Sequence, residues 1–227
     1  MKNRISNMFI LAFFSIATLA CKSDKKNEVE PTGAEEALVA GEEAVKFKID
    51  TSASTIEWKG SKPTGEHIGT IAIQSGFLMA NSEEIKGGSV TINMKSITVM
   101  DEDLSEDKKT SLENHLKGTV EGKETDFFNV PEFPTATFEI TGLTEKEGQQ
   151  ILSGNLTIKE ETKNIEFPVS TTFNGNEVVL ESEPFTIDRT HWNVNYGSKS
   201  VFDNLGDSFI DDDIQLSIKV RAEKVTE

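Results

Sequence analysis

Apolar and polar residues alternate in several short segments of the chain, and this alternation predicts β-strands. A period of two residues places every second side chain on one buried face of a strand. The clearest alternating segments are residues 56–58, 90–94, 138–140, 165–169 and 214–220. Residues typical of tight turns separate them, at 62–65, 86–88, 147–148, 174–176 and 183–184. Short strands joined by tight turns predict an all-β chain with antiparallel pairing.

The most specific local prediction is a β-hairpin at Asn174-Gly175. Both residue types tolerate a positive φ, so residues 165–173 are expected to pair with residues 177–181. Many alternating strands with few helices are typical of a sandwich or of a closed barrel, and closure removes exposed strand edges. The alternation alone does not distinguish these two architectures.

One segment has a helical pattern. Ser105 can cap a helix, acidic residues 106–107 follow in its first turn, and Leu112, His115 and Leu116 recur at helical spacing. This helix is expected to cover one barrel opening or to pack outside the barrel.

An aromatic corner is predicted at residues 126–140. Phe127 and Phe128 precede Pro131 and Pro134, whose rings fix the local backbone before an alternating strand begins. The two phenylalanines are expected to point toward the interior.

The first residues predict export. Lys2 and Arg4 precede an apolar run over residues 8–20 that is too short to span a bilayer. Residues 18–21 resemble a bacterial lipobox, although threonine stands where leucine is usual. Cys21, the single cysteine, is therefore expected to be acylated, which would make the protein a periplasmic, membrane-anchored lipoprotein of the outer membrane. Ordinary signal cleavage that leaves a free thiol is the alternative.

The predicted domain boundaries follow from this export signal. Residues 1–20 form a signal peptide, and residues 21–45 form a flexible acidic linker that carries the lipidated cysteine. Residues 22–45 hold three lysines and seven acidic residues without an aromatic residue, a composition that does not fold by itself. Residues 46–227 form the barrel domain. The net charge of −16 argues against nucleic acid as a partner.

Several segments together resemble the YceI-like family of lipocalin-shaped barrels that bind polyisoprenoid lipids. The resemblance rests on residues 47–50, 54–58, 65–70, 96–101, 112–116, 126–140, 152–159 and 186–192. It implies an antiparallel lipocalin-like β-barrel with one or two short helices, and a polyisoprenoid or similar lipid as partner. Glu160 and Asn193 stand where many members have glycine, and His191 stands where an acid is common.

An isoprenoid chain needs an apolar tunnel, since its binding is driven by buried apolar area. The candidate wall residues are Trp58, Ile71, Ile73, Phe77, Val90, Ile92, Met94, Phe127, Phe138, Phe167 and Phe173. The candidate donors for a polar head group are His67, Lys62, Arg189 and His191. The alternative roles are packed core for each wall residue and a structural salt bridge for Arg189.

No catalytic motif, phosphate-binding loop or metal-ligand spacing is present, so the sequence predicts a binding protein without a cofactor. The aspartates at 203, 207 and 211–213 do not have the spacing of a calcium loop, and the three histidines do not have that of a zinc site. A ligand-free interaction or stress-response module is the alternative function, and a hydrolase-type enzyme using His67 or His191 is a weaker one. The oligomeric state, a dimer included, does not follow from the sequence.

Overall fold

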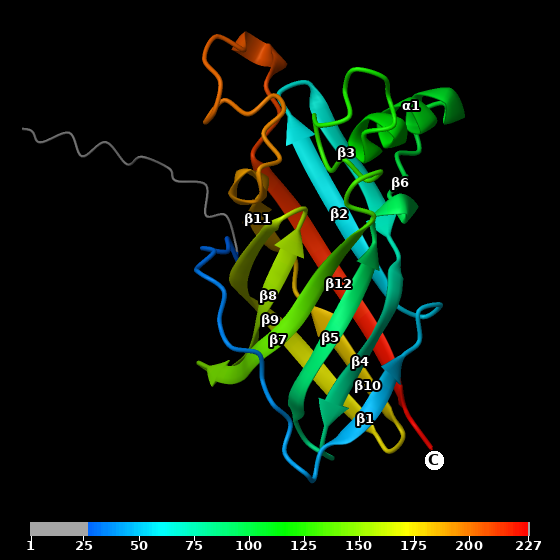
Figure 1. Cartoon of the computed structure of the whole chain (residues 1–227), viewed down its shortest axis with the longest axis vertical. Coiled ribbons are helices and arrows are strands. Elements are labelled where there is room, and N and C mark those ends of the chain that lie inside the picture. The colour runs from blue at the N-terminus through cyan, green and yellow to red at the C-terminus, as the bar shows by residue number, and fades with distance from the viewer. Residues whose placement is uncertain (1–26, 227) are drawn as a thin grey trace, which may run out of the picture.

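Eight antiparallel strands close into a barrel in the computed structural model, which describes residues 27–226 (Figure 1). The barrel order is β1, β4, β5, β7, β8, β9, β10 and β12, and pairing of β1 with β12 closes it. These strands are β1 (Val45–Ile49), β4 (Ile73–Ala80), β5 (Ile85–Asn93), β7 (Thr135–Lys146), β8 (Gln149–Ile158), β9 (Glu161–Asn174), β10 (Glu177–Ser182) and β12 (Asp213–Lys224). The predicted all-β barrel is therefore confirmed, and the sandwich alternative is wrong.

The long strand β12 connects two halves of the molecule. Its C-terminal part pairs with β1 and β10, whereas its N-terminal part pairs with β2 (Thr55–Lys62) and β11 (Phe185–Asp188). The hairpin partner of β2 is β3 (Gly65–Ile71), which pairs in turn with the short β6 (Thr98–Val99). The wall is therefore extended at one end of the barrel by β2, β3, β6 and β11.

The described residues contain one α-helix, α1 (Glu106–Lys117), which lies at this extended end (Figure 1). Three short 3₁₀ helices accompany the strands: η1 (Met94–Ser96), η2 (Arg189–Trp192) and η3 (Gly206–Ser208). Ser105 is the N-cap residue of α1 as predicted, although its side chain makes no capping hydrogen bond. Glu113 fastens the helix to the barrel, because its Oε1 accepts a hydrogen bond from the backbone N–H of Val99 at 2.9 Å.

The hydrophobic core is divided into two clusters. The larger cluster fills the barrel and includes Phe167 and Phe185, whose rings stack with centroids 4.2 Å apart. The smaller cluster lies under α1 and contains Met94, Ile97, Val130 and Ala136. The space between these two clusters is where the candidate site lies.

The hairpin predicted at Asn174-Gly175 is present and joins β9 to β10. Its turn consists of Gly175 and Asn176, and only Gly175 has a positive φ, of 61°. The turn predicted at residues 86–88 is wrong, because Gly87 and Gly88 lie inside β5. Gly88 is required there by close packing, since a Cβ at this position would approach the backbone oxygen of Phe77 to 2.7 Å. Residues 81–84 make the turn instead.

Of the two positions where the family often has glycine, Asn193 retains a glycine-like backbone, with a φ of 55°. At the other, the positive φ, of 54°, falls on Lys159, the residue before Glu160. Asparagine is tolerated in this left-handed region more readily than most residues. These departures from the family pattern therefore leave the two turns in place.

The segment expected to be a flexible linker is instead bound along the barrel from Asn27 onward. The N–H of Val29 donates to Thr186 O at 2.9 Å, and Thr32 exchanges two backbone hydrogen bonds with Asn164. The N–H of Leu38 donates to Ile140 O at 2.9 Å. The composition of a segment predicts only whether that segment can fold by itself. This segment is held by hydrogen bonds to strands that are distant in the sequence. Figure 1 shows it running along β8 and β7 before it enters β1.

The rest of the N-terminal prediction lies outside the described residues. These begin at Asn27, so the signal peptide, the lipobox and Cys21 are not among them. Across residues 27–226, no helix is both long enough and apolar enough to cross a membrane.

Candidate ligand-binding site

A cavity of about 420 Å³ lies inside the extended end of the barrel, beneath α1. Inward-facing residues of β2, β3, β5, β7, β8 and β12 form its wall, and α1, the aromatic corner and the loops around η2 and η3 complete it. This volume is within the range of about 300–1,000 Å³ that is typical of small-molecule sites. The cavity is therefore large enough to hold a ligand.

The lining of the cavity is mostly apolar, and many of its side chains are only partly buried. Trp58, Ile71, Ile92, Leu116 and Ile158 line it without being fully covered by protein atoms. Apolar surface that faces an unfilled space does not gain the ~25 cal/mol per Å² that burial provides. An apolar molecule in this cavity would supply that burial.

Trp58 lines the cavity, and Gly69 leaves room for its indole ring. A Cβ at Gly69 would approach indole atom Cζ2 to 2.5 Å and the carbonyl oxygen of Thr98 to 1.9 Å. Gly69 stands directly opposite Trp58 in the β2–β3 pair. Among the described residues, the buried indole Nε1 of Trp58 has no hydrogen-bond partner.

The helix α1 forms the roof of the cavity. Leu112, His115 and Leu116 line the cavity, in agreement with the helical spacing of the sequence and with the predicted cover over one opening. The helix ends at Gly118, which has a φ of 71°. No residue of α1 is fully buried. The apolar side of α1 therefore faces the cavity rather than a packed core.

The aromatic corner follows α1 and is fixed to it by backbone hydrogen bonds. The N–H of Phe128 donates to Leu116 O at 3.2 Å, and the N–H of Val130 donates to Lys117 O at 2.8 Å. Phe127 is 7% exposed, and Phe127 and Phe128 both line the cavity. The prediction that this corner directs both rings inward is confirmed.

Three rings from separate segments meet at the edge of the cavity. His115 of α1 lies edge-on to Phe127, with centroids 5.0 Å apart, and also to Tyr196, at 5.1 Å. Tyr196 belongs to the loop between η2 and η3 and is 40% exposed. Asp126 holds the His115 ring, because Nε2 lies 2.7 Å from Asp126 Oδ2. These contacts connect the roof, the corner and the loop across the cavity.

Arg189 lines the cavity but uses its guanidinium to hold the protein backbone. Nε, Nη1 and Nη2 donate to the carbonyl oxygens of Asp211, Val194 and Ile210, at 3.1, 2.6 and 3.1 Å. The residue is 3% exposed. Burial lowers the pKa of Arg189, while the carboxylate of Asp212, 3.6 Å from Nη2, acts in the opposite direction. The geometry makes Arg189 a structural cross-link of the η2–η3 loop, with few donors left for a ligand.

His67 marks the polar edge of the cavity. Its Nδ1 lies 2.8 Å from Asp101 Oδ2, and Asp101 Oδ1 accepts a hydrogen bond from the N–H of Ile68 at 3.0 Å. Asp101 is buried, so this pair fixes the orientation of the imidazole. Lys62, at the end of β2, also lines the cavity.

The structure brings together some of the residues predicted to contact a ligand and separates others. Those that line the cavity are Trp58, His67, Ile71, Ile92, Phe127 and Arg189, with Met94 and Lys62. Ile73, Phe138 and Phe167 belong instead to the packed barrel core, where the Phe138 and Phe167 rings lie 5.8 Å apart.

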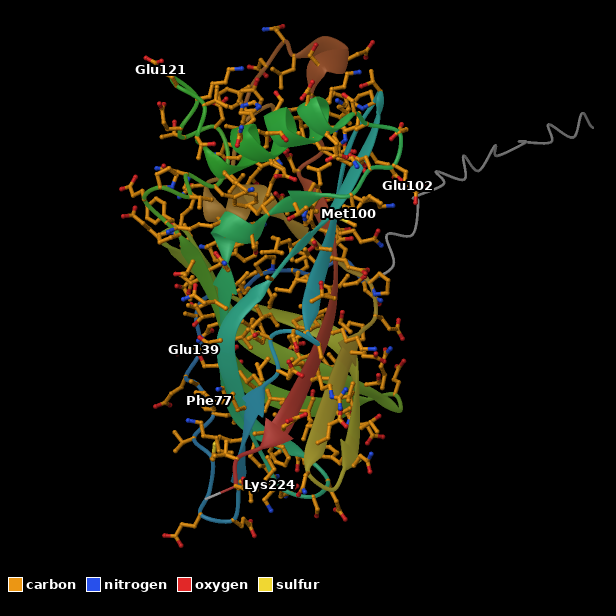
Figure 2. The ribbon with its side chains drawn as sticks, turned by 90° about the vertical axis from the view of Figure 1, so that its right-hand side faces the viewer. Phe77, Met100, Glu102, Glu121, Glu139 and Lys224 are labelled. Carbon is orange, nitrogen blue, oxygen red and sulfur yellow. The ribbon has the colours of Figure 1, made fainter. Side chains whose placement is uncertain are left out.

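Phe77 and His191 also lie outside the cavity. The inward positions of β4 are Leu78 and Ala80, so Phe77 faces outward, where Lys46 Nζ lies 4.6 Å from its ring centroid. Figure 2 labels Phe77 on the side of the barrel. His191 is exposed on η2 and packs edge-on against Trp192. Alternation places residues on a face but does not state which face is the inner one.

Sequence reasoning missed several lining residues. Ile214 and Leu216 lie in a strand that the alternation predicted, so the sequence could have identified them as inward-facing residues. Gly60 continues the inward series of Ile56 and Trp58 on β2. Tyr196 had no such signal, because it lies in an irregular loop.

No cluster of three or more histidine, cysteine, aspartate or glutamate residues able to hold a metal ion occurs in residues 27–226. Asp212 is instead bound to Ser200 and lies near Arg189.

A closed antiparallel barrel with an apolar cavity beneath a helical roof defines a lipocalin-like barrel. The sequence model of the YceI-like domain matches residues 47–222, and the chain therefore belongs to the YceI-like domain family. No curated protein matches the chain.

Two solved structures have the same fold. BcnA from Burkholderia cenocepacia is 19% identical, with a TM-score of 0.55, covering 77% of this chain and 99% of its own. A polyisoprenoid-binding domain from Saccharophagus degradans, implicated in plant cell wall breakdown, is 12% identical, with a TM-score of 0.55, covering 80% of this chain and 99% of its own. At these identities the likeness concerns the fold.

Proposed function

We propose that this protein binds and sequesters or transports a long apolar lipid, a polyisoprenoid or an isoprenoid quinone, inside the barrel. The observation that carries the proposal is the cavity of about 420 Å³, whose apolar lining comes from strands, roof and corner alike. Burial of methyl and methylene groups against this lining would supply the binding free energy. The polyisoprenoid-binding domain from Saccharophagus degradans, which has the same fold, supports this ligand class.

The proposed activity is binding without a chemical step. His67 and His115 are each bound to an aspartate, an arrangement that also occurs in enzymes, but here it orients rings at the edge of an apolar cavity. A hydrophobic tail offers no group for such a pair to act on. We therefore expect transport or storage rather than turnover.

Native mass spectrometry of the full chain, followed by solvent extraction, tests the proposed binding. We expect a co-purified or added isoprenoid to be retained at one molecule per chain, in the apolar cavity of about 420 Å³. A chain that carries no isoprenoid and takes up none when it is supplied would contradict the proposal and favour a ligand-free interaction module.

We further propose that acylated Cys21 anchors the protein to the outer membrane as a periplasmic lipoprotein. Replacing Cys21 by serine is expected to move the protein from the membrane to the soluble fraction, because several acyl chains are needed for stable anchoring and serine accepts none. Membrane fractionation and the intact mass of the chain measure this. Acylation would be contradicted if the variant stays on the membrane and if the measured masses of variant and wild type differ by the same amount from the masses calculated from their sequences.

A further inference from the structure

The segment before β1 is fixed to the barrel at its first described residue. The N–H of Thr186 in β11 donates to Asn27 O at 3.1 Å, and Thr32 pairs with Asn164 in β9. Val29, between these two contacts, is buried in the barrel core. The segment therefore lies between β9 and β11 as a bound part of the barrel wall.

This binding limits how far the barrel can stand from the proposed anchor at Cys21. Cys21 and Asn27 are six residues apart, a separation that an extended chain spans over at most about 20 Å. A free linker over residues 21–45 would have allowed about 80 Å. Residues 22–26 contain three lysines and one aspartate, and basic residues beside an anchor are attracted to anionic lipid head groups. An anchored barrel is therefore expected to rest against the bilayer surface.

Three large apolar side chains are exposed on the loop between η2 and η3. Tyr196, Val201 and Phe202 are 40%, 48% and 48% exposed. The loop lies at the end of the barrel opposite Lys224 (Figure 1 and Figure 2). It follows β11 directly, and β11 is the strand that binds Asn27. Exposed apolar side chains that share one surface are typical of a site that contacts a membrane or another protein.

The base of the η2–η3 loop is held firmly and forms part of the cavity wall. The carbonyl oxygens of Val194 and Ile210, on the two sides of the loop, accept hydrogen bonds from Arg189 at 2.6 and 3.1 Å. The N–H of Ile210 also donates to Gly197 O at 2.8 Å. Tyr196 and Ile210 line the apolar cavity. A lipid that leaves a bilayer at this loop would therefore be next to the cavity.

We propose that the η2–η3 loop is a membrane-docking surface, which inserts Tyr196, Val201 and Phe202 into the bilayer interface so that a lipid can pass into the cavity. This inference rests on the proposed function and adds the surface through which the ligand is acquired. The three side chains gain apolar burial there, and tyrosine suits the interface because its ring is apolar and its hydroxyl is polar. Asp203 and Asp207 are exposed on the same loop and would stay among the head groups, so the insertion is shallow.

Fluorescence quenching on the full, acylated chain tests the docking surface. Cys21 is the single cysteine, so acylation leaves Val201→Cys as the one free thiol for a dye. In vesicles of phosphatidylethanolamine and phosphatidylglycerol, we expect nitroxide-labelled lipids to quench this dye strongly. The control is Lys224→Cys at the opposite end of the barrel, where the dye should stay unquenched (Figure 2).

Two outcomes of this labelling would contradict the proposal. Equal quenching at both positions, or none at residue 201, would overturn the docking surface. Two dyes on one chain would show a free thiol at Cys21 and overturn the anchored orientation.

Lipid uptake provides a second measurement, followed over time by native mass spectrometry. Val201→Ser/Phe202→Ser is expected to slow the uptake of an isoprenoid from vesicles about tenfold or more, because two apolar side chains no longer insert. An isoprenoid supplied in detergent should be retained as by the wild type, since neither residue lines the cavity. The matched control is Val39→Ser/Val225→Ser, which changes two exposed apolar residues outside the loop and should leave the uptake rate unchanged.

The outcomes separate the docking surface from the proposed function. Retention from detergent, with equal uptake from vesicles by the wild type and both double variants, would overturn the docking surface alone. Retention from neither source would contradict the apolar cavity as a lipid site. A dimer that Val201→Ser/Phe202→Ser dissociates, without quenching by membrane lipids, would assign the loop to contact with a second copy of the chain and overturn the proposal.

Discussion

Replacing Gly60 by phenylalanine is expected to weaken lipid retention strongly while the barrel stays folded. Gly60 lies on β2 in the same inward series as Ile56 and Trp58, and it lines the cavity. A Cβ built at Gly60 has no heavy atom within 4 Å, so a side chain there would extend into open space. The phenyl ring would occupy volume that the proposed ligand needs, and we expect affinity to fall by about tenfold or more.

The same substitution should not cost stability. Glycine in a strand is destabilising by roughly 0.5–1 kcal/mol relative to alanine, so the free energy of unfolding should stay equal or rise slightly. Native mass spectrometry and urea unfolding of one protein sample measure both effects. Gly60→Leu provides a smaller obstruction if phenylalanine perturbs the sheet.

Gly41→Phe is the matched control for Gly60→Phe. Gly41 also has no heavy atom within 4 Å of an added Cβ, but it lies in the exposed segment before β1, outside the barrel. This variant should retain lipid as the wild type does. Normal lipid retention by Gly60→Phe would mean that the ligand lies elsewhere and that the proposed cavity is not its site.

The fold was largely predictable because strand alternation and turn residues are local signals. The Asn174-Gly175 hairpin, the helix after Ser105 and the aromatic corner were all found from neighbouring residues. The error at Gly87 and Gly88 has a non-local cause. Gly88 lies close to β4 and Ile140, and Gly87 lies close to Leu38. These are contacts between distant segments, and in the sequence the two glycines resemble a turn signal.

The candidate site was predictable in chemistry but only partly in position. An apolar wall was expected, and Trp58, Ile71, Ile92 and Phe127 do line the cavity. Phe138 and Phe167 are also apolar residues in alternating strands, but they lie in the packed core of the closed barrel. A period of two residues predicts which side of the sheet a residue faces. The height of a residue along the barrel axis depends instead on how β12 pairs with two sets of strands.

The charged segment before β1 also shows that local composition does not predict contacts with distant strands. Its composition predicts a chain without a core of its own, and Val29 is nevertheless buried. The amide of Asn155 both accepts from the N–H of Glu35 and donates to its carbonyl oxygen, at 3.0 and 2.7 Å. A polar segment can therefore be ordered when a finished barrel presents partners for its backbone.

Replacing Arg189 by leucine is expected to cause a large loss of stability. Three carbonyl oxygens would lose their donor, and Asp212 would lose its cation, all in a buried setting. Removing one partner of a buried charged network costs about 3–5 kcal/mol, because the remaining groups stay desolvated. We therefore expect a fall of that size in the free energy of unfolding. Urea denaturation, monitored by tryptophan fluorescence, measures this change.

Arg221→Leu is the control, because Arg221 pairs with Glu177 on the outside of the barrel and its side chain is 44% exposed. An exposed pair of this kind is worth about 0–1 kcal/mol, so the control should unfold almost as the wild type does. The comparison also decides between the two roles that the sequence allowed for Arg189. A head-group contact would leave stability unchanged and weaken only the binding of the lipid. Such a result would contradict the cross-linking role of Arg189.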